Sequence, residues 1–398
     1  MMAGGVRRTV PCYADRVRRP RPSPLLPIAA LLALAACGRL PHPRTLACAA
    51  SPPAPLARMP GGRMSTTIDV LTYNIEGLPW PARSGRGAKL KRIGAILDDL
   101  RRAGEAPDIV LFQEAFSHAA ARAVEHSNYP AIAVGPSRVQ RAPVRADTDL
   151  PGKPRLFRGE IGLRLMNSGL AVASRYPIVA RIAVPYSRPT CAGIDCLANK
   201  GMMMARIAIP GVPVPLQIVN THMNSQGASR VSPARHLAAH NAETAELGTF
   251  MRRHWDQSLP AIFGGDFNMR DAPKRFAPFW DSQRLALVHR FCIDPANRCD
   301  VRLSWDGDEP WMDTQDLQFF ASGAQVTVRP IRVEAMFDGS ETSPMLSDHD
   351  GLRVLYRLEW RASAPTMAGC GAATVAARRG AEARRYPATR FRPPAFAL

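Results

Sequence analysis

Short apolar runs, many of them rich in β-branched residues, recur along the chain and alternate with polar loops. Residues 68–75 have apolar side chains at alternating positions, which is typical of a half-buried strand, and 108–112 form a continuous apolar run of strand length. The predicted strands are 68–75, 108–112, 169–174, 202–209, 216–220, 261–264, 317–321, 326–333 and 352–360.

Helical patterns are fewer. Residues 89–102 carry apolar side chains three or four positions apart, and a second helix is predicted from Ser232 and Pro233 to about His254. Serine is a favoured N-cap, and proline fits the first turn. Many strands with few helices predict an α/β (α+β) fold, in which two packed, mostly antiparallel sheets are flanked by helices in a four-layer sandwich. We expect a single folded domain over 65–360.

The positive charge is concentrated at the two ends of the chain. The formal net charge is +19 over 398 residues, and +15 of it falls in residues 1–64 and 361–398. We predict a disordered basic tail over 361–398 and a disordered tether over 38–64. Because the folded part keeps only about +4, the charge gives little support to DNA binding.

The N-terminal segment is typical of an export signal. Arginines precede an apolar run over 25–36 that is too short to span a bilayer. The run ends at Cys37, as in the lipobox of bacterial lipoproteins, so residues 1–37 are predicted to be a signal peptide with Cys37 as the lipidated residue. The alternative is ordinary cleavage near Cys48. The protein would then be lipid-anchored to a bacterial membrane in the first case, and periplasmic or secreted in the second.

Four cysteines of the folded part form two local pairs in loop-like sequence. The pairs are Cys191 with Cys196 and Cys292 with Cys299. In an exported protein such pairs favour disulfides. A zinc site is the competing interpretation, but the spacings differ from the usual pattern of two residues between ligands.

Polar residues follow the ends of several predicted strands. They are Asn74, Glu114, His222 and Asp266, together with Asp348 and His349 before the last strand. Singly, each is more often a turn former or a loop residue. Because buried strands carry rigid side chains to one edge of a sheet, we expect the whole set to converge on one pocket.

The residue types in this set suit phosphoryl chemistry with a divalent metal. Glu114 and Asn74 offer the hard oxygen atoms that Mg²⁺ prefers, and such an ion neutralises phosphate charge. Histidines transfer protons near neutral pH. Asp316 is a candidate partner that fixes the tautomer of His349.

Five motifs occur in a fixed order: Tyr73-Asn74-Ile75-Glu76-Gly77, Gln113-Glu114, Asn220-Thr221-His222, Gly265-Asp266-Phe267-Asn268 and Ser347-Asp348-His349. The ordered set resembles the endonuclease/exonuclease/phosphatase superfamily, which has the fold of pancreatic deoxyribonuclease. The resemblance spans residues 68–358 and implies a metal-dependent phosphodiesterase.

Within that superfamily, the stretch from Cys191 to Gly201 is similar to bacterial neutral sphingomyelinase C. The resemblance implies that Asn74 and Glu114 hold Mg²⁺, with Mn²⁺ or Co²⁺ as alternatives. It further implies roles for other residues of the site. Asp348 is counted among the catalytic residues, although the resemblance assigns it no individual role. Asp266 and Asn268 would orient water, Asp316 would steady His349 as general base, His222 would steady the phosphate or protonate the leaving oxygen, and Lys200 would neutralise a phosphate oxygen. A solvated surface lysine is the alternative for Lys200.

Two features depart from the sphingomyelinase pattern. Sphingomyelinases enter membranes with an aromatic-rich hairpin, whereas residues 322–346 contain Phe337 as their one aromatic residue. Residues 138–164 form an inserted basic loop. The missing hairpin weakens the expectation of membrane attack. We expect a monomeric enzyme that acts on a phospholipid or another phosphodiester and makes at most peripheral membrane contact. A nuclease acting on nucleic acid and a catalytically inactive binding module are the alternatives.

Overall fold

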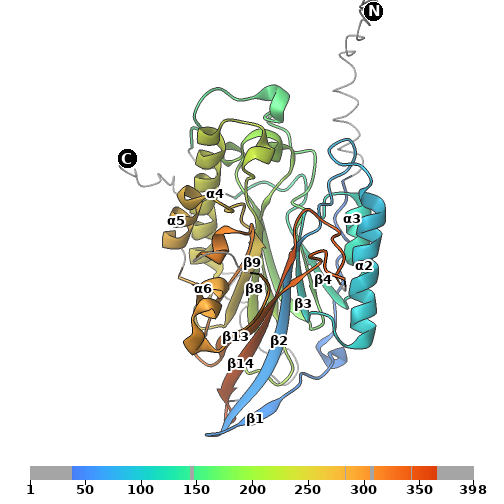
Figure 1. The fold of residues 1–398 in the computed structure, drawn as a ribbon, viewed down its shortest axis with the longest axis vertical. Coiled ribbons are helices and arrows are strands. Elements are labelled where there is room, and N and C mark those ends of the chain that lie inside the picture. Colours follow the sequence, from blue (N-terminus) through green and yellow to red (C-terminus); the bar gives the residue numbers. More distant parts are fainter. Residues whose placement is uncertain (1–37, 144–147, 283, 305–308, 342, 365–398) are drawn as a thin grey trace, which may run out of the picture.

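Two mixed β-sheets pack face to face, and helices cover the outer faces (Figure 1). The computed structural model describes residues 38–143, 148–282, 284–304, 309–341 and 343–364. This arrangement confirms the predicted fold class. Residues 1–37 with Cys37, and residues 365–398 of the predicted tail, lie outside the described part.

The larger sheet has eight strands in the order β11-β13-β14-β2-β3-β5-β4, with β1 paired to β2. Its strands are β1 (Ala57–Met59), β2 (Arg63–Asn74), β3 (Ile109–Gln113), β4 (Ala131–Val134), β5 (Ala171–Ser174), β11 (Asp300–Arg302), β13 (Thr327–Met336) and β14 (Gly351–Arg361). The pairs β2–β3 and β11–β13 are parallel, and the other pairs are antiparallel.

The smaller sheet has six strands in the order β10-β12-β9-β8-β7-β6. They are β6 (Ile178–Pro185), β7 (Gly201–Ile207), β8 (Leu216–His222), β9 (Ala261–Asp266), β10 (Ala286–Leu287) and β12 (Asp316–Ala321). Only the β8–β9 pair of the described residues in this sheet is parallel.

Helices α2 (Arg86–Ala103) and α3 (His118–His126) cover the larger sheet, and α4 (Pro233–His254) and α5 (Pro273–Ser282) cover the smaller one (Figure 1). Helix α6 (Val288–Ile293) contacts β12 and β13. The 3₁₀ turns are η1 (Cys48–Ala50), η2 (Leu156–Arg158), η3 (Arg188–Thr190), η4 (Gly193–Leu197), η5 (Gly227–Ser229), η6 (Pro295–Asn297) and η7 (Pro310–Met312).

Apolar side chains fill each space between layers. Val70 of the larger sheet and Ile218 of the smaller one belong to the cluster between the sheets. Leu90 and Leu97 of α2 pack on the outer face of the larger sheet, and Phe279 of α5 packs on the smaller. Full burial of each such side chain contributes roughly 1.5–3 kcal/mol, so the layer contacts are the main stabilising term.

Two buried amide side chains bridge the sheets. Asn220 of β8 donates to the carbonyls of Phe112 and Ala171, both at 3.0 Å, and accepts from Gln113 at 2.7 Å. Gln318 of β12 donates to the Val70 carbonyl of β2 at 3.0 Å. Buried amides must be hydrogen-bonded to avoid a desolvation penalty, so these bridges fix how the two sheets align.

The predicted strands and helices are present, with ends that shift by a few residues. The segment 38–64 differs from the predicted tether. There, the Arg44 N–H donates to the Ile132 carbonyl at 3.0 Å, and β1 pairs with β2. These backbone pairs attach the segment to the larger sheet.

Both predicted disulfides form, Cys191–Cys196 and Cys292–Cys299. A sulfur used in a disulfide is no thiolate ligand, so these bonds replace the zinc alternative. Within the described ranges, no helix has the length and apolar character needed to cross a membrane.

Candidate active site

Residues singled out in the sequence lie at the ends of neighbouring strands, at one edge of the sandwich. Asn74 ends β2, His222 ends β8 and Asp266 ends β9, while Glu114 directly follows β3 and Asp316 begins β12. Strand register places Asp266 beside His222 in the parallel β8–β9 pair and beside Asp316 in the antiparallel β9–β12 pair. The register therefore brings these side chains to one place.

Asp266 is the centre of a buried polar cluster. Its Oδ2 accepts a hydrogen bond of 2.9 Å from Asn74 Nδ2 and lies 3.3 Å from His222 Nε2 and 3.9 Å from His349 Nε2. Its Oδ1 accepts a 3.0 Å bond from the Asn268 N–H. A carboxylate held through both oxygens has a fixed orientation, which suits it to position a small reactant such as water.

Asp316 holds His349. Asp316 Oδ2 lies 2.5 Å from His349 Nδ1, which fixes the proton on Nδ1 and turns Nε2 toward Asp266 and Asn74. Burial alone would lower the pKa of His349, but the carboxylates of Asp316 and Asp266 outweigh it and hold the pKa well above 6.5. The Ser347 hydroxyl donates to the Asn74 carbonyl at 2.7 Å and accepts from the His349 N–H at 3.3 Å.

Glu114 occupies a strained backbone position. Its φ is 57°, and a Cβ at Gly77 would lie 2.2 Å from the Glu114 carbonyl oxygen, so that approach requires glycine. In the described part of the chain, no hydrogen bond or ion pair engages the carboxylate. Burial raises the pKa of Glu114 to about 7, although Lys200 and His349 oppose the rise. A strained, unpaired carboxylate in a polar cluster is typical of a functional residue.

Lys200 lies buried beside His222. Its ammonium is 2.9 Å from His222 Nε2, donates to the Met223 carbonyl at 3.0 Å and forms an ion pair with Asp195. Because the ammonium donates, His222 Nε2 is an acceptor and its proton is on Nδ1. Burial, Lys200 and His349 together lower the pKa of His222 well below 6.5, which keeps its ring neutral. Lys200 is only 6% exposed, which does not fit a solvated surface lysine.

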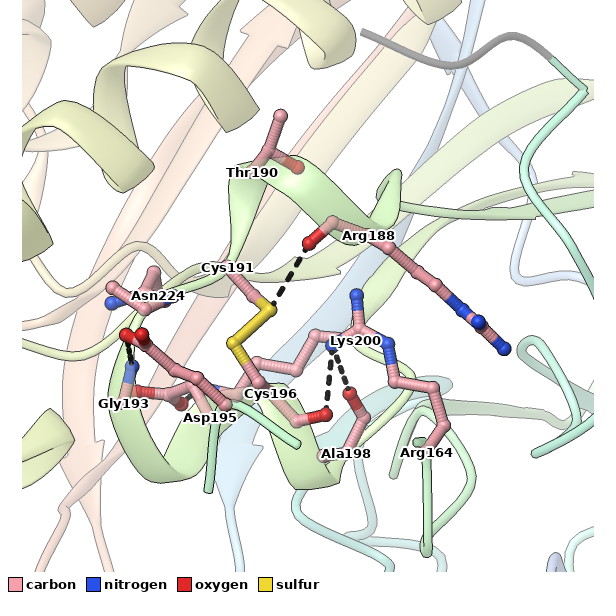
Figure 2. Close-up of a disulfide and its surroundings, with 12 residues drawn as sticks. Arg164, Arg188, Thr190, Cys191, Gly193, Asp195, Cys196, Ala198, Lys200 and Asn224 are labelled. Atoms are coloured by element: carbon pink, nitrogen blue, oxygen red, sulfur yellow. Dashed lines mark hydrogen bonds and ion pairs between the residues drawn. A yellow bond between two sulfur atoms is a disulfide. The ribbon is translucent and has the colours of Figure 1, made fainter. Parts of the chain in front are cut away.

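The Cys191–Cys196 disulfide closes the loop that supplies Asp195 (Figure 2). Asp195 accepts hydrogen bonds from the N–H and the hydroxyl of Ser225. Arg164 reaches the loop from the inserted segment and donates to the Cys196 carbonyl at 3.2 Å (Figure 2). The disulfide loop is thus attached to Lys200 on one side and to the insert on the other.

A set of buried charged residues beneath the site was missed in the sequence. Arg275 of α5 donates to the carbonyls of Asn224 and Asn268 at 2.6 and 3.0 Å and of Ser225 at 3.1 Å. Glu243 of α4 accepts from the Asn224 N–H at 2.6 Å. These bonds fix the loops after β8 and β9. The sequence signal that could have identified them is a charged residue on the buried face of a helix. Burial of a charge costs free energy unless the charge is paired.

Asp348 lies outside the hydrogen-bonded cluster around Asp266. Its side chain is 49% exposed and forms an ion pair of 3.2 Å with Arg83. Arg83 also pairs with Glu76 at 2.9 Å, and Glu76 pairs with Arg86 at 3.0 Å. Asp348 therefore links the loop before β14 to the loop after β2.

Asn74 and Glu114 fit a divalent cation that keeps much of its water. Among the described residues, no group of three or more His, Cys, Asp or Glu side chains could enclose a metal ion. Asn74 Oδ1 accepts from the Glu76 N–H at 3.0 Å and keeps a second lone pair. One amide oxygen with one unpaired carboxylate is a donor set that suits Mg²⁺, which takes few protein ligands.

A cavity of about 750 Å³ opens beside His349. The charged residues that line it, other than histidines, are Asp313, Asp316, Asp338, Asp348, Asp350, Arg270 and Arg302. Five carboxylates against two guanidinium groups give this lining an acidic character, with Asp316 paired to His349 and Asp348 paired to Arg83.

Comparison with known proteins identifies a protein family whose model matches this chain. The model of the Endonuclease/Exonuclease/phosphatase family matches residues 71–349, a range that includes every member of the polar cluster. No curated protein matches the sequence.

Several solved structures are similar in fold. Sphingomyelinase C from Streptomyces griseocarneus is 19% identical, with a TM-score of 0.50, over 72% of this chain and 98% of that chain. A beta toxin variant from Staphylococcus aureus with bound magnesium ions is 16% identical, with a TM-score of 0.48, over 73% and 99%. TDP2 from D. rerio in complex with a single-strand DNA product is 15% identical, with a TM-score of 0.47, over 73% and 98%.

Proposed function

The chain belongs to the endonuclease/exonuclease/phosphatase family, and from this premise we propose that it is an exported, Mg²⁺-dependent phosphodiesterase that releases phosphorylated head groups from lipids. The observation that carries the substrate class is the acid-lined cavity beside His349. A choline-type head group has a permanent positive charge, which complements this lining, whereas successive phosphates of DNA would be repelled by it.

Asn74 and Glu114 are the residues that would hold the cation. When bound, a divalent cation neutralises charge on the phosphate oxygens and helps to position water. Glu114 supports this role because its carboxylate is only partly exposed and has no hydrogen bond among the described residues. A positive charge would offset the cost of keeping that carboxylate ionised.

His349 is proposed to take the proton of the attacking water in its neutral form, so its raised pKa predicts that turnover increases with pH until the ring is deprotonated. The water oxygen bonds to phosphorus in line with the lipid oxygen, the bond from phosphorus to that oxygen breaks, and the lipid alkoxide is protonated by solvent. Asp316 supports the role of His349 because it stabilises the imidazolium that forms. Asp266 and the Asn268 N–H form a fixed pair that would orient the water.

Lys200 and His222 are proposed to bind the phosphate. Lys200 supplies a positive charge within a buried cluster, where electrostatic interactions are stronger than in water. His222 stays neutral, since burial and Lys200 lower its pKa. This favours the steadying role for His222 over the role of an acid that protonates the leaving oxygen.

Export is supported by the disulfides Cys191–Cys196 and Cys292–Cys299, because disulfides persist in oxidising compartments. The arginine-rich start and the apolar run before Cys37 support a signal peptide, and Cys37 is proposed as a lipid anchor. Labelling of the unmodified protein with palmitate, and loss of the label in the Cys37→Ser variant, would support the lipid anchor. An unlabelled, freely released protein would contradict it.

A nuclease is the second candidate function, because a basic hollow lined by Arg138, Arg141 and Arg188 lies on the same protein. The deciding assay uses the mature protein with Mg²⁺ and with EDTA on sphingomyelin, phosphatidylcholine, DNA and a chromogenic phosphodiester. Metal-dependent phosphocholine release supports the proposal. DNA cleavage without phosphocholine release would overturn the lipid substrate, and no turnover of any phosphodiester would indicate a binding module.

Two variants test the site. Glu114→Gln and His349→Ala should each lower turnover by about 10³-fold or more in protein that circular dichroism shows to be folded, because each removes a group that acts on the reacting atoms. Asp281→Asn is the control, since Asp281 is exposed on α5 and does not line the cavity beside His349. Turnover near that of the unmodified protein in either Glu114→Gln or His349→Ala would remove that residue from the mechanism.

A further inference from the structure

The inserted segment between β4 and β5 presents a cluster of exposed apolar side chains. Of the ten large apolar residues exposed in the described part of the chain, four belong to it. Phe157 is fully exposed, and Val139, Leu156 and Leu163 are 77%, 60% and 58% exposed. A local cluster of this kind marks an interaction surface more often than scattered single residues do.

Basic side chains surround these apolar residues. Arg138, Arg141, Lys153, Arg155 and Arg158 of the same segment are exposed, and none forms an ion pair within the described ranges. Arg188 from the neighbouring turn η3 is also exposed. We call these ten residues the docking face: Arg138, Val139, Arg141, Lys153, Arg155, Leu156, Phe157, Arg158, Leu163 and Arg188.

Two hollows lie at the docking face. One hollow of about 720 Å³ is lined by Arg138, Arg141 and Leu163, and an adjoining hollow of about 290 Å³ by Pro154 and other residues of the insert. Both hollows share Arg188 as a lining residue. Pro154 and Glu160, which line the second hollow, flank in sequence the turn η2 that carries Leu156 and Phe157, so this hollow and the two apolar side chains belong to neighbouring parts of the insert.

Buried contacts fix residues 159 and 160 of the segment to the disulfide loop and to α4. Gly159, at φ 96°, packs so closely on the disulfide loop that a Cβ there would lie 2.8 Å from Ile194 Cα. Glu160 accepts from the Gly193 N–H at 2.7 Å and forms two bonds of 2.9 Å with Arg235. The turn that exposes Leu156 and Phe157 is thus fixed to the Cys191–Cys196 loop.

The same contacts place the docking face at the active-site end. The segment forms the top of the molecule in Figure 1, opposite β1, and β2 runs from β1 toward Asn74 of the site. Asn199 donates to the carbonyls of Ser137 and Gln140 at 2.7 and 2.9 Å, and the next residue is Lys200. The insert is therefore attached directly beside the phosphate-binding lysine.

We propose that the docking face binds the surface of an anionic lipid bilayer and brings the active-site end to it. Exposed Leu and Phe side chains enter the boundary between head groups and acyl chains, while arginines bind lipid phosphates. The functional role of this binding rests on the proposed function, in which the substrate is a lipid. Binding itself does not require catalysis.

Other occupants fit this surface less well. The two ends of the chain that the structure does not describe, 1–37 and 365–398, are themselves rich in arginine, so like charge disfavours their docking here. Nucleic acid would use the arginines but would leave Leu156 and Phe157 exposed to water. A lipid surface uses both kinds of side chain.

The test is vesicle sedimentation of the mature protein in EDTA, which suppresses turnover, and at low salt. We expect binding to phosphatidylcholine vesicles containing phosphatidylglycerol to exceed binding to pure phosphatidylcholine by about 10-fold or more, and to weaken as salt is added. The double variants L156S/F157S and R141E/R158E should each lose about 10-fold or more of that binding. Leu56→Ser beside β1 and R252E/R253E at the end of α4 are the matched controls and should bind like the unmodified protein.

Hydrolysis of a water-soluble chromogenic phosphodiester separates this inference from the proposed function. Both docking-face variants should keep that activity and an unchanged unfolding midpoint while losing vesicle binding. The inference is overturned if the two vesicle types bind alike, or if L156S/F157S binds vesicles like the unmodified protein. It is also overturned if R141E/R158E loses affinity for duplex DNA but not for vesicles, because the face would then recognise nucleic acid.

Discussion

The two disulfide loops are nearly equal in length but differ in what they contact. Cys191–Cys196 has a sequence separation of 5, and its loop contains Asp195, which pairs with Lys200 and Ser225 of the candidate site. Cys292–Cys299 has a separation of 7 and joins α6 to the start of β11. There, Cys292 packs within the apolar cluster between the sheets.

This difference shows that a disulfide alone does not identify a functional loop. Both bonds restrict the unfolded chain by similar amounts, so both stabilise the fold. Only the first fixes a charged residue whose partner lies in the polar cluster around Asp266. The Cys191 loop is therefore expected to affect kcat as well as stability. The Cys292 loop, which precedes Arg302 of the cavity lining, is expected to affect stability and substrate binding but not kcat.

Of the changes that separate the two loops, removal of the lysine that joins the Cys191 loop to the site should have the largest effect. Lys200→Met keeps the apolar stem but removes the charge proposed to bind the phosphate, so we expect kcat/KM to fall by about 10²–10³-fold. Steady-state kinetics on the chromogenic phosphodiester measures the loss. Lys274→Met on α5 is the control, because Lys274 is exposed and makes no ion pair within the described ranges. An equal loss in both variants would contradict a role specific to Lys200.

Near Cys292, a buried histidine should make the free energy of unfolding depend on pH. Burial lowers the pKa of His289, one turn before Cys292, to about 4 from an ordinary 6.5. Between these values the unfolded chain binds the proton more readily than the folded chain, so stability falls as pH decreases from 6.5 to 4. The linked loss for this group is about 3 kcal/mol.

Urea unfolding of the unmodified protein and of His289→Leu at pH 7 and pH 4 measures that loss. The variant should lose less stability on acidification, by the amount that His289 contributes. Parallel pH profiles for the two proteins would show that His289 does not titrate across this range in the folded state.

Much of the fold was predictable because each strand carries its own local signal. The run before Glu114 is continuously apolar, and its strand lies in the interior of the larger sheet with both faces covered. Short elements such as α3 and β4 were missed because nine and four residues hold too little periodicity. Contacts with neighbouring elements, rather than local preference, stabilise them.

The site was predictable to the extent that its residues follow strands. Asn74 and Asp266 could be singled out because a strand end fixes where a side chain lies. The roles of Asp195, Glu243 and Arg275 were not predictable, because each depends on partners distant in sequence. Arg275, for example, binds the Asn224 carbonyl 51 positions away. Asp348 shows the converse, since the motif groups it with His349 while its side chain pairs with Arg83.

Breaking each disulfide in turn is the direct test of the comparison between the two loops. C191S/C196S and C292S/C299S should each lower the free energy of unfolding by about 2 kcal/mol, because the closed loops are similarly short. Only C191S/C196S should also lower kcat, by about 10-fold, since Asp195 would hold Lys200 less firmly. Unfolding by urea and kinetics at a temperature where both variants are folded give the two quantities. Equal effects on kcat would show that the two loops do not differ in function.

The smallest expected effect concerns Arg290, which lies on α6 two residues before Cys292. Its guanidinium lies 4.9 Å from the ring centroids of both Trp280 and Trp311. Because Arg290 is exposed, loss of this cation–π contact in Arg290→Gln should lower the free energy of unfolding by only about 0.5–1 kcal/mol. We expect kcat to remain unchanged, because no ion pair links Arg290 to the polar cluster in the described part of the chain. Urea unfolding and kinetics on the same preparation measure both. A fall in kcat without a loss of stability would place the Cys292 side in the catalytic machinery and remove the distinction between the two loops.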